Sequence, residues 1–460
     1  MALEDNPQVL VALGFCLPAT PAAIAAIEEC FHPIAIGTTA EDWIRLYVPT
    51  AAEETMLGQR NAGYTASWVA QIADIPQLEW DELAAPLATP FLEWEWLHNL
   101  ETSGCATPRE GWQPVHLVVR RDRQLVAAAP LYVKGHSYGE FVFDHQWAEL
   151  AYRLGARYYP KLLGMTPFTP AVGYRFLIAP GEDEAALTAL IVAEIDRFCD
   201  REQLGGCHFL FVDPDWRSLL ETLGFSSWMH HSYIWGNNNY QGFDDYLQTF
   251  NANQRRNIKK ERKKVMNAGL RVEAHVGEEI PRSFYPLIYR FYSHTCDRFF
   301  SSSKYLTRQF FEQLYPNYRD RVVTFVAYPE DEPHPVGLSF CIRKGDRLYG
   351  RYWGCFEDYD CLHFEACYYK PIEWGIAQGI NSFDPGAGGR HKRRRGFPAT
   401  PNFSLHRFTD PRMAQILQHY IGEIDAAEQE AIDAINDELP FSKREVALDP
   451  EALSERAPSK

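Results

Sequence analysis

The 460-residue sequence lacks several features that mark common classes of protein. Its ten cysteines are scattered with no Cys-x-x-Cys pair, which is typical of reduced thiols rather than of a disulfide framework. No apolar run approaches the roughly 20 residues that a membrane-spanning helix needs. The signature motifs of P-loop nucleotidases and of HExxH metalloproteases are also missing. We therefore expect a cytoplasmic protein outside these two enzyme classes.

Metal-ligand patterns are equally scarce. His363 and Cys367 stand four residues apart, with Cys355 and Cys361 nearby, but this spacing matches no known zinc-ligand pattern. We therefore expect no metal site.

Positive charge is in short supply over the whole chain. The sequence has 45 lysines and arginines against 61 acidic residues, which gives a formal net charge of −16. Such a chain has no bulk attraction for nucleic acid or phosphate. Two dense basic clusters, within 251–270 and 384–397, therefore need local explanations.

The first basic cluster predicts a helix over 251–270, with Asn251 as its N-cap and Gly269 as its stop. Glu261 is the only acid among seven bases, so pairing within the helix cannot neutralise them. This concentration favours contact with a polyanion, although a solvated surface helix is the alternative. The candidate residues for this polyanion contact are Arg255, Arg256, Lys259, Lys260, Arg262, Lys263 and Lys264.

The second basic cluster, DPGAGGRHKRRRGF at 384–397, follows a glycine-rich turn. Glycines permit positive φ and close approach to a ligand, and successive N–H groups in such a turn form a cradle for an anion. The adjoining bases add charge to it, so we expect an anion-binding site rather than a basic surface tag. Its candidate residues are Gly386, Gly388, Gly389, His391, Lys392 and Arg395.

A repeated order of elements indicates a duplicated unit. Residues 115–133 and 322–342 each predict a β-hairpin with a charged turn. Each hairpin is followed by a further strand, a helix, a glycine break and a strand that ends in Asp-Pro, at Asp213 and Asp384. We expect two copies of one α/β module with mixed sheets and flanking helices, and the alternative is a single irregular α+β domain.

The expected organisation has four parts. The appended α/β segment at the N-terminus has no assigned role, and an acidic amphipathic helix that begins at Pro411 follows the modules, with a tail after it. The boundaries are 1–63 for the appended segment, 64–240 and 241–410 for the two modules, and 411–460 for the helix and tail.

With these features in view, the chain resembles the FemAB-like family of peptidoglycan biosynthesis or recognition proteins. The stretches that carry the resemblance include KGHSYGEFVFD at 134–144, LYGRYWGC at 348–355 and FDPGAGGRHKRRRGF at 383–397. It implies tandem modules of the GNAT type, the fold of many N-acyltransferases. It also implies acyl transfer to an amine, with a cell-wall precursor as acceptor and charged tRNA as the candidate donor.

One departure bears on the acyl donor. GNAT enzymes that use acetyl-CoA carry a glycine-containing loop that holds pyrophosphate at a helix N-terminus. The equivalent stretch here has Glu357, Asp358 and Asp360 instead. We therefore expect no cofactor, and a CoA-dependent N-acetyltransferase remains an alternative. A non-catalytic protein that binds RNA or a cell-wall precursor is another.

Acyl transfer to an amine needs a neutral nucleophile, stabilisation of the oxyanion and a route for protons. His391 is the expected general base or proton shuttle, because an unperturbed imidazole titrates at about pH 6.5. Lys392 or Arg351 is expected to stabilise the oxyanion.

The remaining roles concern the acceptor amine and the leaving group. Asp384 and Glu365 are expected to orient the incoming ammonium, and Tyr352 to protonate the leaving hydroxyl. The resemblance further implies an acceptor cleft between the two modules, lined from the first module. Its lining residues would be His136, Glu140, Asp144 and Lys161. The oligomeric state is left open.

Overall fold

The computed structural model describes residues 55–56, 63–142, 144–299 and 304–442. The segment expected over 1–63 and the tail after 442 therefore lie almost entirely outside the described residues. In the described part of the chain, no helix is both long and apolar enough to cross a membrane.

The first half of the chain builds two sheets that share one hydrophobic core. The smaller sheet has the order β1-β2-β4-β5-β8, in which the predicted hairpin is β4 and β5. Its strands are β1 (Thr55–Met56), β2 (Tyr64–Val69), β4 (His116–Arg121), β5 (Gln124–Ala129) and β8 (Leu177–Ile178).

The larger sheet has the order β10-β17-β9-β7-β6-β3, and its β7 and β9 run parallel. Helix α7 precedes β9, as the sequence predicts. The strands are β3 (Trp112–Pro114), β6 (Tyr132–Lys134), β7 (Lys161–Gly164), β9 (Gly206–Phe209), β10 (Ser226–Tyr233) and β17 (Ala399–Phe408). The helices of this half are α4 (Gln77–Ala84), α5 (Trp94–Thr102), α6 (His145–Arg153), α7 (Glu184–Arg201) and α8 (Pro214–Thr222).

The second half repeats the hairpin and the parallel strand pair of the first half, but in a single sheet. Its order is β11-β16-β15-β14-β13-β12. Its hairpin is β13 and β14, and β15 runs parallel to β16. The strands are β11 (Trp235–Gly236), β12 (Leu270–Val276), β13 (Val322–Pro329), β14 (Gly337–Lys344), β15 (Arg347–Cys355) and β16 (Ser382–Asp384). The helices are α9 (Phe243–Thr249), α10 (Ala252–Asn267), α11 (Phe284–Phe299), α12 (Arg308–Asn317), α13 (Leu362–Phe364), a π-helical turn at Glu365–Tyr369, and α14 (Lys370–Ala377). Two modules with mixed sheets are thus confirmed.

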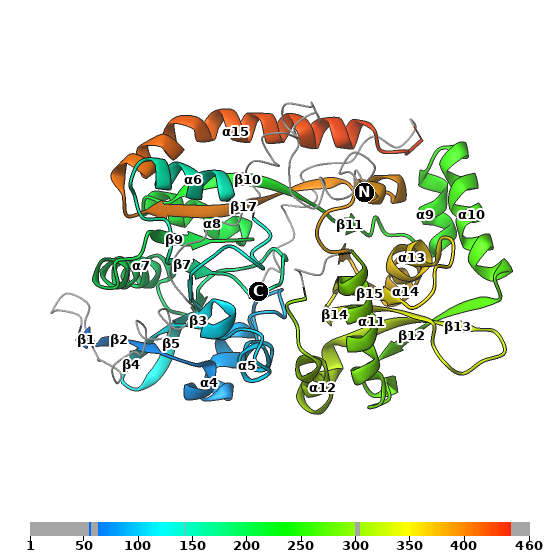
Figure 1. Cartoon of the computed structure of the whole chain (residues 1–460), viewed down its shortest axis with the longest axis horizontal. Helices are drawn as coiled ribbons and strands as arrows, with labels where there is room; N and C mark the ends of the chain where they lie inside the picture. The colour runs from blue at the N-terminus through cyan, green and yellow to red at the C-terminus, as the bar shows by residue number, and fades with distance from the viewer. Residues whose placement is uncertain (1–54, 57–62, 143, 300–303, 443–460) are drawn as a thin grey trace.

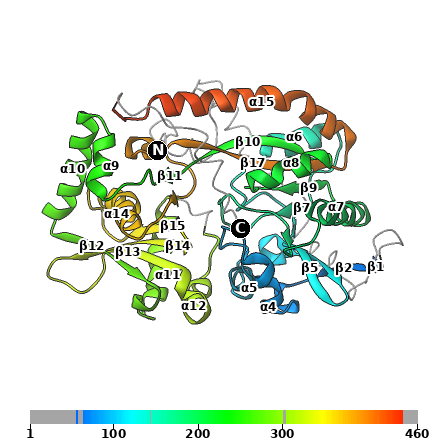
Figure 2. The same ribbon diagram turned by 180° about the vertical axis from the view of Figure 1, so that it is seen from behind.

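One strand crosses between the halves. β17 lies in the range that the sequence assigned to the second module, yet it pairs with β10 and β9 of the first-half sheet. From there the chain enters α15 (Pro411–Asp437), whose N-cap Asp410 accepts a hydrogen bond from the Arg412 amide. Figures 1 and 2 show α15 lying along the molecule over β10 and β17, with its end toward α9 and α10.

The two halves also meet through polar contacts around residues 84–93. Lys344 donates to the carbonyls of Ala84 and Thr89, and Arg321 pairs with Glu93 at 2.7 Å. The ring of Phe91 packs against Tyr349 of β15. The first-half loop before α5 is thereby fixed against the sheet of the second half.

Candidate functional site

The break between β15 and β16 is the centre of the candidate site. These parallel strands pair only from Arg347 with Ser382 to Tyr349 with Asp384. β15 continues to Cys355 along β14, but within the described residues no strand pairs with its other edge beyond Tyr349. The main chain after Tyr349 therefore lacks a strand partner on this side, beside the Asp384–Pro385 strand end, while α11 covers its far part, where Thr295 donates to the Trp353 carbonyl at 2.8 Å.

Arg351 and Asp384 form a buried ion pair at this break. Nη2 of Arg351 donates to Oδ2 of Asp384 at 2.6 Å, and the two side chains are 3% and 10% exposed. The amide of Gly386 donates to Oδ1 of the same carboxylate at 2.8 Å. Nε and Nη1 of Arg351 are buried and have no hydrogen-bond partner among the described residues. Asp384 thus holds both the guanidinium and the start of the glycine turn.

Lys392 supplies a second buried cation next to this pair. Its ammonium donates to the carbonyls of Gly386 and Ala387, which leaves the third N–H of the ammonium for another acceptor. Burial lowers the pKa of Lys392 to about 7, with Asp384 opposing this shift and Arg351 adding to it. The turn therefore presents carbonyls to Lys392, which differs from the cradle of N–H groups that the sequence predicted.

His391 lies among aromatic side chains, where burial disfavours the charged imidazolium. Its Nε2 is 2.8 Å from the hydroxyl of Tyr368, and its ring contacts His363 and Phe364. Burial, together with the charges of Lys392 and Arg395, lowers the pKa of His391 to about 4. The imidazole is neutral at pH 7 and a much weaker base than the sequence suggested. Lys392 is the group here whose pKa lies near neutrality.

Two further predicted site residues, Glu365 and Arg395, bind other parts of the chain. Glu365, in the π-helical turn, accepts hydrogen bonds from Arg262 of α10. Arg395 pairs with Glu261 at 2.8 Å and stacks its guanidinium over the ring of Phe364. These contacts connect α10 to the segment that carries Lys392, so they help to fix the position of Lys392.

Tyr352 follows Arg351 on β15 but packs into the core. Its ring stacks on Phe340 of β14 and contacts Tyr292 of α11. Burial raises the pKa of its phenol. These contacts give its hydroxyl no partner at the Arg351–Asp384 pair.

The basic helix forms as predicted, but several of its basic side chains are already bound within the protein. Asn251 caps α10 by accepting from the Gln254 amide, and Gly269 ends it with φ of +67°. Arg262 pairs with Glu365 and Glu373, Lys264 pairs with Asp360, and Arg255 donates to main-chain carbonyls. The exposed bases with no ion pair described for them are Arg256, Lys259, Lys260 and Lys263.

A polar cavity of about 340 Å³ continues this surface at the start of α10. Asparagines of α10 and its cap lie on one side, and Arg393 and Arg394 lie on the other. Arg393 is paired with Glu438, whereas the side chain of Arg394 is exposed. The cavity brings the two basic clusters of the sequence next to each other.

The predicted acceptor residues of the first module form a buried charge cluster instead of a cleft. Lys161 pairs with Glu140 at 2.7 Å and with Asp144 at 2.5 Å, and all three side chains are at most 3% exposed. The carboxylates raise the pKa of Lys161, and Lys161 in turn holds the pKa of Asp144 below its usual range. His136, on the loop over the cluster, has a pKa lowered to about 4 by burial.

A second lysine in this cluster was not predicted from the sequence. Lys134 of β6 lies directly opposite Lys161 of β7, and its ammonium sits 3.7 Å from the ring of Trp112. Burial lowers the pKa of Lys134 to about 7. The period-two pattern of these short strands places both lysines on the same face, but only pairing the strands reveals that they meet.

The sequence Gly-His-Ser-Tyr-Gly at 135–139 also fits the nucleophile motif Gly-x-Ser-x-Gly, although no such site was predicted from the sequence. Ser137 lies in a loop after β6 and not on a strand-to-helix elbow. Its hydroxyl accepts from Lys161, which the carboxylates keep as an ammonium. Its hydroxyl also bonds the Asp144 carboxylate, but Lys161 holds the pKa of that carboxyl below its usual range, which makes it a weak base toward the serine.

The chain is similar to one family in sequence and to several solved structures in fold. No curated protein matches the sequence. Among solved structures, the fold is similar to FemX at 12% identity, with a TM-score of 0.46 over 75% of this chain and 98% of that one. It is also similar to L-PGS from Bacillus licheniformis at 12% identity, with a TM-score of 0.44 over 73% and 98% of the two chains. A tandem GNAT protein from the clavulanic acid biosynthesis pathway matches at 10% identity, with a TM-score of 0.40 over 75% and 99%.

The family-level match covers most of the chain. The sequence model of the FemAB-like family, described as peptidoglycan biosynthesis/recognition, matches residues 71–443. This range includes both modules apart from β1 and β2, the basic helix, the β15–β16 break and all of α15. The protein therefore belongs to the FemAB-like family.

Proposed function

We propose that this protein is an N-acyltransferase that joins an acyl group to an amine of a cell-wall precursor, with charged tRNA as the candidate donor. The family description supports the connection with peptidoglycan. The observation that carries the proposal is the pair of buried cations, Arg351 and Lys392, around Asp384 at the open edge of β15.

Each part of this arrangement suits acyl transfer. The main chain of 350–352, which has no strand partner on this edge, can pair with an extended substrate, as an unpaired strand edge does with peptides. Attack by an amine develops negative charge on the acyl oxygen, and a buried ammonium stabilises such a charge more strongly than one in water. Lys392 fits this role because two of its N–H groups are already held by carbonyls and one remains.

The proposal is tested by transfer of radiolabelled amino acids from a pool of charged tRNA to a cell-free acceptor fraction. We expect Lys392→Met to lower the rate at least a hundredfold, the usual effect of removing an oxyanion donor. Arg390→Met is the matched control, because Arg390 is exposed in the same basic run. Equal rates in Lys392→Met and the wild type would contradict the proposal.

RNA contact is proposed for the exposed face of α10 and the adjoining cavity. Changing Arg256, Lys259, Lys260 and Lys263 to alanine should weaken RNA binding at least tenfold at 0.1 M salt. The dependence of log K on log salt should also become shallower, by about 0.7 for each phosphate that the helix no longer neutralises. A control variant with exposed Arg109, Arg123 and Arg347 changed to alanine should keep the wild-type slope. An unchanged slope in the α10 variant would remove RNA from this surface.

The second candidate function is recognition without catalysis, in which the protein binds RNA or a precursor on the same surfaces. The α10 face favours it as much as it favours transfer. Binding of RNA that persists with no transfer in the wild-type protein would select this function over the first.

A CoA thioester is the least favoured donor. The loop between β15 and α13 holds Asp358 in an ion pair with Arg298, and Asp360 in an ion pair with Lys264. Acidic side chains at a helix start oppose the binding of a pyrophosphate there. Saturable binding of CoA would reverse this order of donors.

A further inference from the structure

The buried charges at the strand break balance only while Lys392 is neutral. Asp384 pairs with Arg351, whereas Lys392 bonds two carbonyls, so a proton on Lys392 leaves one buried positive charge in excess. The neighbouring bases are already matched, because Arg395 pairs with Glu261 and Arg262 pairs with Glu365. Buried positive charge in excess is costly unless an anion completes it.

Arg351 has hydrogen-bond donors to spare. Nη2 is used by Asp384, whereas Nε and Nη1 are buried without a partner among the described residues. The guanidinium carbon lies 5.2 Å from the ring of Phe91 and 5.5 Å from that of Tyr349, so two aromatic rings set its position. Leaving donors of a charged group unpaired is expensive. A fixed guanidinium with unused donors is suited to accept an oxyanion.

The glycine turn lies next to these donors, because the Gly386 amide and Arg351 bond the same carboxylate. The side chain of Arg351 is buried, but the residue as a whole is only half-buried, because its main chain lies on the open edge of β15. Ala387 and Gly388 of the turn are exposed, and Gly386, Gly388 and Gly389 all have positive φ. A turn built of such residues can change conformation at low cost and admit a ligand.

We propose that Arg351, with Lys392 behind it, recognises an oxyanion on the substrate itself, a carboxylate or a phosphate that stays unchanged in the reaction. This site would select substrates that carry such a group beside the acyl centre. Asp384 is its positioning residue, since it holds both Arg351 and the Gly386 amide. The identification of the ligand as a substrate rests on the proposed acyltransferase function, whereas the anion site itself does not.

An anion in this position changes the protonation of Lys392. The titratable and charged groups that face Lys392 include Asp384, Arg351, Cys367, His363, Tyr233 and the adjacent His391. The pKa of Lys392 is about 7, so a part of the population is neutral at pH 7.5. A bound anion favours the ammonium, and binding should therefore take up protons.

The test is isothermal titration calorimetry of the full chain with sodium acetate and with sodium sulfate at pH 7.5. Each titration is run in buffers of different ionisation enthalpy, which measures proton uptake. We expect saturable binding of at least one anion, with uptake of between zero and one proton. A preference for acetate identifies a carboxylate ligand, and a preference for sulfate identifies a phosphate.

The variants locate the site. Arg351→Met should weaken binding at least tenfold, and Arg390→Met, in the exposed part of the same basic run, should not. Lys392→Met should abolish proton uptake. If Arg351→Met fails to fold, the double variant Arg351→Met/Asp384→Asn removes both members of the ion pair and is measured in its place.

Two outcomes overturn the inference. One is the absence of saturable binding of both anions to the wild-type protein. The other is full binding by the variants that lack Arg351. Failure of the transfer assay with anion binding intact would reject the proposed function and keep the site, so the two failures are distinguishable.

Discussion

Replacing Asp384 with asparagine should lower the free energy of unfolding by about 3 to 5 kcal/mol. The substitution keeps the shape of the side chain but leaves the guanidinium of Arg351 buried without a counter-charge. Breaking a buried ion pair by removal of one partner typically costs this much. The loss is measured by urea unfolding followed by tryptophan fluorescence, with circular dichroism to check that the transitions coincide.

Two further variants make this result specific. Asp331→Asn lies in the exposed turn between β13 and β14 and should change the free energy by less than about 0.5 kcal/mol. Arg351→Met in the Asp384→Asn background should recover part of the loss, because it removes one uncompensated cation. A loss below about 1 kcal/mol in Asp384→Asn would mean that solvent reaches the pair more freely than its burial indicates.

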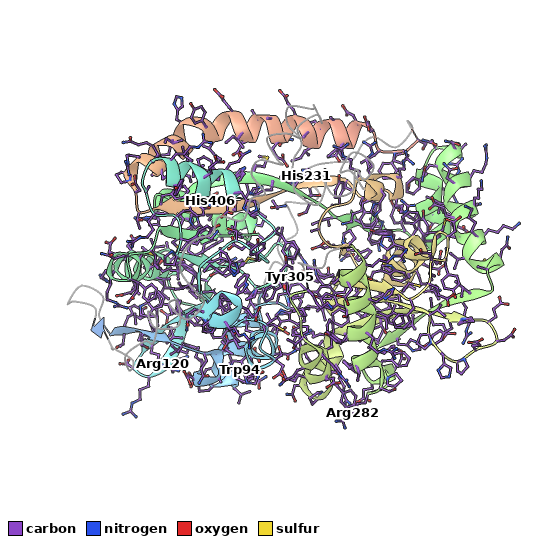
Figure 3. All side chains as sticks on the ribbon, viewed as in Figure 1. Trp94, Arg120, His231, Arg282, Tyr305 and His406 are labelled. Atoms are coloured by element: carbon purple, nitrogen blue, oxygen red, sulfur yellow. The ribbon has the colours of Figure 1, made fainter. Side chains whose placement is uncertain are left out.

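Acidification should destabilise the protein through a chain of buried histidines. Nδ1 of His208 lies 2.9 Å from Nδ1 of His406, and Ser404 lies 2.7 Å from Nε2 of His406 and 2.8 Å from Nε2 of His230. These residues come from β9, β17 and β10, and Figure 3 labels His406 among the strands below α15. A proton on both imidazoles of the first pair would place two charges side by side in the core.

The direction of the pH effect follows from the pKa values. Burial lowers the pKa of His230 to about 4 and that of His406 to about 3, and it also lowers the pKa of His208. Since an unfolded histidine titrates near 6.5, the unfolded chain binds more protons below that pH. Stability is complete above pH 6.5 and declines as the pH falls toward 4. Each histidine should cost about 2 kcal/mol at pH 5.

The measurement is the free energy of unfolding between pH 7.5 and 5. His406→Gln should make this dependence shallower by about one proton, or about 1.4 kcal/mol per pH unit. His419→Gln, on the exposed face of α15, should leave the slope unchanged. A His406→Gln profile parallel to that of the wild type would assign the acid sensitivity to other groups.

Local signals in the sequence were sufficient for several helix ends and for the repeated order of hairpin, helix and strand. Asn251, Gly269 and Pro411 mark helix ends because caps and stops act within a few residues. The two hairpins and the Asp-Pro strand ends follow from period-two patterns and turn residues in the same way. Arg351, Asp384 and Lys392 come together because the ends of parallel strands share one edge, which the repeated module allowed us to expect.

Other features depend on contacts that sequence spacing does not encode. The charge of Glu365 predicts a role beside Asp384 in orienting the amine. In the structure, however, Glu365 accepts hydrogen bonds from Arg262, 103 residues earlier in the chain. The sequence predicts that His391 is a base of ordinary strength. Its pKa is lowered by burial among aromatic residues of another segment, which include Phe364. The exchange of β17 into the first-half sheet could not be predicted, since either sheet would accept the same alternating pattern.

That exchange sets the order in which the chain can be completed during synthesis. The first-half sheet receives β17 between β9 and β10, so it stays incomplete until residue 408 has left the ribosome. Until then, the edges of β9 and β10 are unpaired and open to association with other chains. An isolated fragment of residues 64–240 should therefore aggregate, and supplying β17 and α15 in trans should restore solubility. We therefore expect the two architectural modules to fold as one unit.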